Sequence, residues 1–360
     1  MTTYYPDQRY AANLTLIRRE CVLPEEAAGQ INVGEGKRVD VRDVVARGQV
    51  PNRHIIIDAA KRLGLRNPDE LPALMQVDLG VAVDEQQVLA GKNPKRGKRV
   101  FAPVRGIVMA VQDGTIILQQ MPQKVELEAG VRGRVTGIIP GRGVVIEAVG
   151  AQMQGVWGND KRSIATLRIE PEDGIETFVA SEFDLRFVGA VILTTRPISQ
   201  MTLDVMRERN FVGIIAPSAD ASLLDSLLAA KGPILLTEGF GGAKMSLSVF
   251  RLLAQYDGQQ VTVDAHLPSR WEARRPEVIV NLAARADERP ARPNPMLALR
   301  QNMTVRVTRD PYAGQTGKVL DLPKSPVLLP NGLRVLCARV ELVAGEVTHI
   351  PLANLEVLGR

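Results

Sequence analysis

The sequence predicts a multidomain protein that combines all-β parts with one small parallel α/β part. Three observations support this fold class. The chain of 360 residues is longer than one ordinary hydrophobic core supports. A region dense in Val, Ile and Gly contains a duplicated segment, and a later region alternates apolar runs with helical segments. The last stretch returns to short strands separated by turns.

These patterns divide the chain into five parts. The first part mixes short alternating runs (Gly34–Val41) with helical stretches at His54–Leu63 and Pro68–Met75. Proline and glycine mark the boundaries that follow. The predicted parts are an N-terminal mixed segment (1–76), a β domain with an internal repeat (77–183), a small α/β domain (184–280), an Arg/Pro linker (281–296) and a C-terminal β-barrel (297–360).

The β domain contains the internal repeat. Ala102–Val111 is echoed 27 residues later by Ala129–Ile138, and each copy continues into a glycine-containing turn and an apolar strand. Gly106 and Gly133 stand where the chain bends and where a Cβ atom would obstruct it. Because neither copy hides its apolar residues alone, we expect the two copies to pack on each other.

The repeat resembles the barrel-sandwich hybrid of biotinyl and lipoyl domains, over about residues 78–150. The likeness is carried by Ala102-Pro103-x-x-Gly106-x-Val108. Carrier domains of that family present a lysine at a hairpin tip, whereas the turns here, Gln112–Thr115 and Pro140–Gly143, contain none. The resemblance therefore implies a scaffold without a swinging-arm cofactor, and no cofactor is expected.

The densest basic cluster of the chain lies just before the repeat. One interpretation is a solvated loop, and the other is a patch that contacts phosphate groups of a nucleic acid or another partner. The candidate residues are Lys92, Lys95, Arg96, Lys98 and Arg99.

Residues 184–265 alternate strands with helices, which predicts a small parallel sheet covered by helices. In the second helix, leucines recur on one face, and Ser218 and Asp220 stand near its N-cap. The expected strands are Phe187–Leu193, Phe211–Ala216, Pro233–Leu236 and Val261–Val263, and the expected helices are Ser199–Glu208, Ala219–Ala230 and Met245–Gln255.

A glycine-rich turn after the third of these strands is the best candidate for an anion site. Its backbone N–H groups would cradle a phosphate at the carboxyl edge of the sheet. The residues are Glu238, Gly239, Gly241, Gly242 and Lys244, but their spacing does not match a Walker loop. No serine elbow, histidine pair or carboxylate pair accompanies them, so no catalytic residue is predicted.

The C-terminal part contains Val305–Val319, which resembles the KOW motif of NusG-type transcription factors and some ribosomal proteins. The matching features are an apolar strand, a turn, Gly314, Gly317 and Val319. The glycine that usually precedes the first strand is replaced by Asn302-Met303. The resemblance implies an SH3-like barrel that contacts RNA or protein, and the alternative is ordinary barrel surface. The candidate contact residues are Arg306, Arg309, Tyr312 and Lys318.

The composition excludes several classes of protein. Hydrophobic residues make up 45%, the formal net charge is +5, and no segment has the ~20 apolar residues that span a bilayer. Cys21 and Cys337 fall in different predicted domains, and His54, His266 and His349 are scattered, so neither a disulfide nor a metal site is expected. We therefore expect a cytoplasmic protein without membrane insertion, whose charge slightly favours polyanionic partners.

The favoured function is a non-enzymatic adaptor or assembly protein that docks on a macromolecular complex. RNA and the transcription or translation machinery are its candidate partners. One alternative is an enzyme that binds a nucleotide or phosphometabolite at Gly239–Gly242. Another is a structural subunit of a large homo-oligomer.

Overall fold

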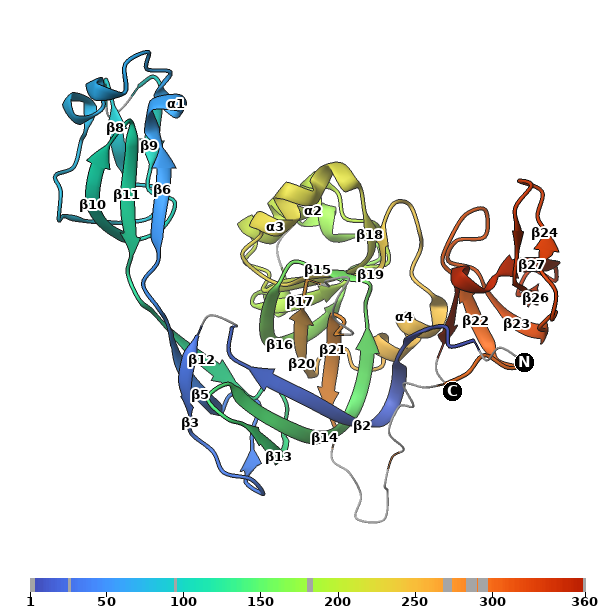
Figure 1. Cartoon of the computed structure of the whole chain (residues 1–360). Coiled ribbons are helices and arrows are strands. Elements are labelled where there is room, and N and C mark those ends of the chain that lie inside the picture. Colours follow the sequence, from blue (N-terminus) through green and yellow to red (C-terminus); the bar gives the residue numbers. More distant parts are fainter. Residues whose placement is uncertain are drawn as a thin grey trace.

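The structure is a computed structural model, and it describes residues 4–24, 27–93, 96–179, 184–267, 274–282, 290 and 297–358. β-Strands are the most common secondary structure among these residues and form several separate sheets, with a few short helices (Figure 1). The expectation of a β-rich, multidomain fold is confirmed at this level. No helix in the described ranges is long and apolar enough to cross a membrane.

A mixed sheet of eleven strands forms the centre of the described structure. Four neighbouring strands, β16 to β19, run parallel, and the strands beyond them are antiparallel to their neighbours. Strand β2 (Ala11–Val22) pairs with β14 beside this path. The order is β15 (Trp157–Gly158), β19 (Ile234–Phe240), β18 (Gly213–Ala219), β17 (Ala190–Leu193), β16 (Lys161–Ile169), β20 (Gln260–Ala265), β21 (Glu277–Asn281), β14 (Gly143–Gln154), β13 (Gly133–Ile139) and β4 (Arg38–Val39).

The central parallel strands β17 and β18 are buried along their whole length because helices cover both faces of the sheet there. Helices α2 (Gln200–Glu208) and α3 (Leu224–Ala229) pack on one face, where Ile192, Ile214 and Leu236 are buried. Helix α4 (Leu247–Ala254) packs on the other face against the alternate residues of the same strands. The alternation predicted for residues 184–265 is therefore present, but its last strand, β20, pairs antiparallel with β16, so the prediction of a parallel strand at Val261–Val263 is wrong. Strands β15 and β16, which precede the predicted boundary at residue 184, belong to the same sheet.

The duplicated β segment forms two modules, one of which is inserted in the other. The inserted module (residues 54–120) lies between β5 and β12 of the parent module, and β5 and β12 pair as an antiparallel hairpin across the insertion. The parent module consists of β2, β3 (Ala28–Ile31), β4, β5 (Val44–Val50), β12 (Gln123–Glu128), β13 and β14. The inserted module consists of β6 (His54–Asp58), α1 (Ala59–Leu63), the short helices η1 (Pro68–Glu70) and η2 (Pro72–Leu74), β7 (Ala82–Val83), β8 (Val88–Gly91), β9 (Arg99–Phe101), β10 (Gly106–Gln112) and β11 (Thr115–Gln120).

The two modules share one hydrogen-bond register. Hairpins β10–β11 and β13–β14 both shift register at matching positions, between Val108 and Ala110 and between Val135 and Gly137. Strand β7 pairs with β10 as β4 pairs with β13, and β6 pairs with β11 as β2 pairs with β14. The duplication therefore extends beyond the segments that the sequence echo covers, because it also includes β4 and β7, and β2 and β6.

Close approach of the backbone explains the two glycines that the repeat singled out. A Cβ atom on Gly106 would lie 2.5 Å from the carbonyl oxygen of Gln119, and one on Gly133 would lie 2.3 Å from that of Glu147. Both glycines therefore allow neighbouring strands to pair closely at the start of a hairpin.

The C-terminal module is a six-stranded sheet that includes a strand from the first ten residues of the chain. Strand β1 (Asp7–Arg9) pairs in parallel with β28 (Leu355–Leu358). The remaining strands of this sheet are β22 (Thr304–Val307), β23 (Thr316–Asp321), β26 (Cys337–Leu342) and β27 (Val347–Pro351). The module also contains a separate hairpin of β24 (Val327–Leu328) and β25 (Arg334–Val335), and the short helix η6 (Leu352–Asn354) precedes β28. Two other short helices, η3 (Ile175–Val179) and η4 (Leu185–Phe187), belong to the α/β part.

The strands cross the predicted divisions of the first half of the chain. Residues 1–76 contribute strands to the C-terminal module, to the central sheet and to both β modules, and position 76 falls inside the inserted module. Most of the predicted linker, 281–296, lies outside the described residues.

Candidate binding surfaces

The glycine-rich segment that the sequence favoured as an anion site continues strand β19. Gly239 pairs with Ser218 of β18, and the N–H of Gly241 donates a hydrogen bond of 2.9 Å to the carbonyl oxygen of Ala219. The side chain of Lys244 is exposed. Sheet pairing therefore involves Gly239 and Gly241, which the sequence placed in a phosphate-cradling turn, whereas Gly242 and Lys244 lie beyond the end of β19.

Glu238 belongs to a buried ion cluster. Its side chain, which is 0% exposed, contacts Arg9 at 3.6 Å and also contacts Arg306. Glu356 pairs with the same two arginines, at 2.6 Å from Arg9 and 3.2 Å from Arg306. We call these four residues the β19 cluster. It joins the central sheet to β1, β22 and β28 of the C-terminal module.

The β19 cluster also places a carboxylate at the N-terminus of α4. The N–H of Ser246, the N-cap of α4, lies 3.3 Å from Oε1 of Glu238 and donates to it. The carboxylate therefore occupies the helix terminus that would otherwise attract an anion. Burial raises the pKa of Glu238 to about 7, although the charge of Arg9 acts in the opposite direction.

The predicted contact residues of the KOW-like segment do not form one surface. Arg306 is 4% exposed and belongs to the β19 cluster, so the prediction that it contacts a partner is not supported. Arg309 and Lys318 are exposed. Tyr312 is half-buried, and its hydroxyl donates a hydrogen bond of 2.5 Å to Glu346.

Apolar side chains are exposed around the β24–β25 hairpin of the C-terminal module. Leu328, Leu333 and Leu336 are 60%, 57% and 40% exposed. The sequence pattern does not predict this surface, because a two-residue strand gives no clear periodicity.

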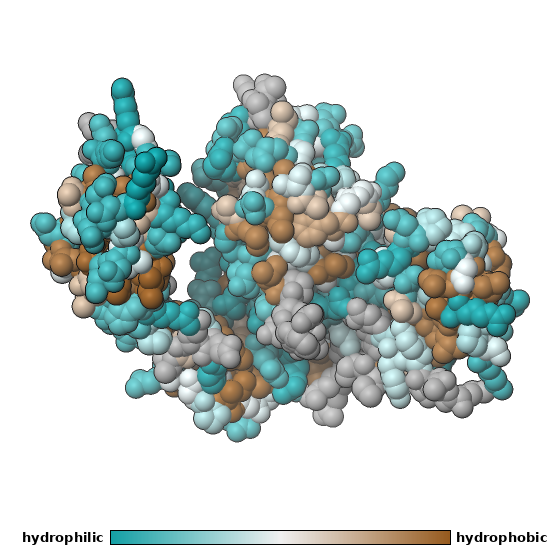
Figure 2. Space-filling view, turned by 45° about the horizontal axis from the view of Figure 1, so that its top comes forward, coloured by the Kyte–Doolittle hydropathy of each residue, from teal (hydrophilic) through white to brown (hydrophobic). Residues whose placement is uncertain are grey.

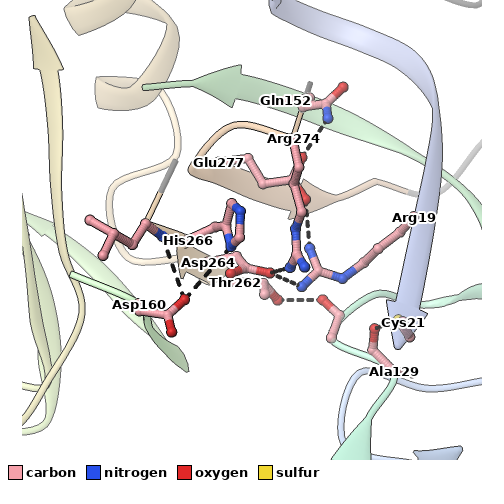
Figure 3. A network of polar contacts seen from close by, with 12 residues as sticks. Arg19, Cys21, Ala129, Gln152, Asp160, Thr262, Asp264, His266, Arg274 and Glu277 are labelled. Carbon is pink, nitrogen blue, oxygen red and sulfur yellow. Dashed lines mark hydrogen bonds and ion pairs between the residues drawn. The ribbon is translucent and has the colours of Figure 1, made fainter. Parts of the chain in front are cut away.

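A second polar network ties the parent module to the central sheet (Figure 3). Arg19 of β2 is buried and pairs with Asp264 of β20 and, at 2.6 Å, with Glu277 of β21. Arg274 lies 2.8 Å from Asp264. Burial alone would raise the pKa of Asp264, but Arg19 and Arg274 hold it below its usual value. Thr262 adds a hydrogen bond of 2.6 Å to the carbonyl oxygen of Gly130. This network is structural, because its charges are paired with one another.

The inserted module exposes an apolar face. Its sheet of β6, β11, β10 and β7 turns one set of residues toward the module core and the other set outward. Ile56, on the outer side, is 71% exposed, and Met109, at the register shift, is 48% exposed. We call this surface the outer face; its apolar residues are Ile56, Ala82, Ile107, Met109, Ala110 and Ile117, and the polar residues His54, Asp58, Thr115 and Gln119 lie on the same side of the sheet.

The parent module is polar at four of the six matching positions, whereas Gly137 and Val145 match Ala110 and Ile117. By register, Glu20 takes the place of Ile56. Arg134 likewise takes the place of Ile107, and it faces Arg38 as Ile107 faces Ala82. Thr136 matches Met109 at the register shift. The same fold therefore accepts charged residues on this face, so its stability does not require the apolar ones.

The basic cluster lies at the end of the inserted module that is farthest from β5 and β12 (Figure 1). Lys92, Arg96 and Lys98 are exposed. Arg99 is half-buried, with its guanidinium 5.0 Å from the ring centre of Phe101. Lys95 lies outside the described residues. The neighbouring cations of α1, Lys61 and Arg62, were not predicted to belong to this cluster.

Two further features bear on the enzyme alternative. A cavity of about 350 Å³ lies between α2 and α3, near residues 210 and 232 at the amino ends of β18 and β19. In open α/β sheets, ligands bind at the carboxyl ends of the strands instead. Within the described ranges, no three His, Cys, Asp or Glu side chains are grouped so as to hold a metal ion.

Comparison with known proteins supplies no family for the chain. No protein-family model matches it, and a search of curated proteins finds no similar sequence.

Proposed function

We propose that this protein is a non-enzymatic adaptor that docks on a macromolecular complex through the outer face of its inserted module. The observation that supports this is the difference in polarity between two copies of one fold. Where the parent module carries Glu20 and Arg134, the inserted module carries Ile56 and Ile107. An exposed apolar surface that the fold does not need is typical of a protein-binding site.

The proposal includes a finer description of the modules. Both β modules are proposed to be barrel-sandwich hybrids, and the C-terminal module an SH3-like barrel of the KOW type. In the inserted module the β10–β11 turn is covered: the carbonyl oxygen of Gly114 accepts a hydrogen bond of 2.8 Å from Ala60, and a Cβ atom on Gly114 would lie 2.6 Å from that of Ala60. A covered turn favours a scaffold over a carrier that swings a modified lysine.

The arrangement of the modules suits an adaptor. The β19 cluster and the Arg19 network fix the C-terminal and parent modules to the central sheet, whereas the inserted module extends from the parent module on two connecting segments (Figure 1). Apolar residues also gather on the inserted module and on the C-terminal module in the space-filling view (Figure 2). Two such surfaces at separate places allow one chain to bridge two partners.

Two matched variants test the docking face. Met109→Glu adds a charge to the outer face, and Thr136→Glu adds the same charge at the matching position of the parent module. Both positions are exposed, so we expect both variants to fold. After cross-linking in the source cells and affinity purification, we expect the wild type and Thr136→Glu to retain one stoichiometric partner that Met109→Glu loses. The proposal would be refuted if the wild type were recovered only as a free monomer, or if both variants recovered equal amounts of the partner.

A further inference from the structure

Cations from two separate segments meet at the end of the inserted module that points away from the parent module. The loop 92–99 contains five Lys or Arg residues and no Asp or Glu, and the segment 59–66 contains three and none. The segments are adjacent, because a Cβ atom on Gly64, the C-cap of α1, would lie 2.8 Å from Nζ of Lys98. We call the described residues of these two segments the distal end.

Both basic segments are additions that the parent module lacks. In the parent module β2 ends at Val22 and β3 begins at Ala28, whereas in the inserted module α1 follows β6 directly. The loop between β8 and β9 occupies the place at which the parent module carries the insertion. Because the parent copy folds without either segment, the shared fold does not account for their charge.

The cations at the distal end are available to a partner. Lys61, Arg62, Arg66, Lys92 and Lys98 are exposed. In the described part of the chain, no ion pair joins any of these five residues to a carboxylate; the nearby Asp58 caps α1 by accepting a hydrogen bond of 3.0 Å from the N–H of Lys61. Like charges held this close repel one another, and a polyanion would relieve the repulsion.

The distal end differs in chemistry from the outer face. The exposed large apolar residues of the inserted module are Ile56, Leu79, Val81 and Met109, and none of them belongs to the distal end. Protein interfaces have an apolar, charge-depleted centre, whereas nucleic-acid interfaces are polar and strongly positive. The distal end therefore fits a nucleic acid better than an acidic protein.

We propose that the distal end binds the phosphodiester backbone of a nucleic acid, with Lys61, Lys92 and Lys98 among the contacts. The binding is electrostatic and independent of base sequence. Phe101, the aromatic residue that follows the loop in the sequence, is already covered by the guanidinium of Arg99, 5.0 Å from its ring centre, so it does not stack on a base. This inference goes beyond the adaptor proposal, since it concerns a different surface and a different class of partner.

Fluorescence anisotropy with the full-length protein tests the inference. The probes are a short labelled DNA duplex, an RNA duplex of the same sequence and the corresponding single strands, each titrated between about 50 and 200 mM salt. We expect the Lys92→Glu/Lys98→Glu variant to bind at least about tenfold more weakly than the wild type. For the duplexes, the slope of log K against log salt should become shallower by about 0.9 for each phosphate that the variant no longer neutralises. The order of affinity among the probes identifies the nucleic acid.

The control variant makes the same change of charge elsewhere. Arg38→Glu/Arg134→Glu alters two exposed arginines of the parent module, and we expect it to keep the wild-type affinity. Circular dichroism should show that all variants are folded. Anionic vesicles of phosphatidylserine serve as a further probe. The inference is overturned if the wild type binds none of the nucleic acids at low salt, or if both double variants lose affinity equally. It is also overturned if the Lys92→Glu/Lys98→Glu change weakens binding to the vesicles but to none of the nucleic acids. Because Met109→Glu should bind these probes like the wild type, this test is separate from that of the docking face.

Discussion

The β19 cluster should make the stability of the junction between the central sheet and the C-terminal module depend on pH, and the Glu238→Gln variant isolates this dependence. Burial raises the pKa of Glu238 to about 7 from its ordinary value of 4.5. Between these two pH values the folded chain keeps a proton that the unfolded chain loses. The free energy of unfolding therefore falls as the pH rises through this window.

The size of the effect follows from the size of the shift. A displacement of the pKa from 4.5 to about 7 corresponds to about 3 kcal/mol of differential stability. The side chain is 0% exposed, so solvent screening does not reduce this value substantially. Relative to Glu238→Gln, we expect the wild type to lose about 3 kcal/mol between these pH values, since other titrating groups contribute equally to both proteins.

Tryptophan fluorescence reports on this junction. Trp157 packs on Phe240 with a centroid distance of 5.1 Å, and Phe240 lies two residues after Glu238. Urea unfolding in a Trp271→Phe background, followed at several pH values, gives the two stability profiles. If the profiles run parallel, Glu238 is ionised throughout this range, and its pairing with Arg9 and Arg306 outweighs burial.

Three further predictions concern the architecture. Arg19→Leu leaves two buried carboxylates short of a partner, so we expect a loss of about 3–5 kcal/mol and faster hydrogen exchange in β2 and β20; unchanged exchange would show that the network is dispensable. Gly106→Ala places a Cβ atom 2.5 Å from a carbonyl oxygen, and thermal unfolding should show a loss of about 1–3 kcal/mol; an unchanged midpoint would contradict the close approach. Because Val50 and Gln123 are paired neighbours, replacing residues 51–122 with an Asn-Gly turn should leave the parent module folded, with its amide spectrum preserved; an unfolded product would contradict the insertion.

The α/β part could be predicted from the sequence because its signals are local. Each buried strand is a short apolar run, and each helix repeats apolar residues within a few turns. Ser199 caps α2 with a side-chain hydrogen bond of 3.1 Å to the N–H of Thr202, which confirms the predicted start of that helix.

The nesting of the two β modules was not predicted, because strands such as Arg38–Val39 are too short to show a period. A signal was nevertheless present. The segment Val39–Ala46 is echoed 44 residues later by Val83–Ala90. Both segments begin with Val-Asp, continue with three residues that differ, and end with two apolar residues followed by Ala. In this echo the parent copy comes first, whereas in the echo of Ala102–Val111 the parent copy comes second. Only an insertion of one copy within the other gives that order.

The candidate site residues were predicted less well than the fold. Glu238 and Arg306 were assigned to two separate binding sites, but the structure buries them together in one cluster. Their pairing depends on the contact between two modules far apart in the sequence, which no local pattern encodes. The outer face was missed for a related reason: an exposed isoleucine is recognised as unusual only when the register of both copies is known.

Site-specific photo-cross-linking in the source cells tests the docking claim most directly. A photoreactive amino acid placed at Ile56, and in a second variant at the matching Glu20, samples the same point of the fold in the two modules. The proposed function predicts a discrete cross-linked product from position 56 and none from position 20. Equal products from both positions, or no product from position 56, would contradict it.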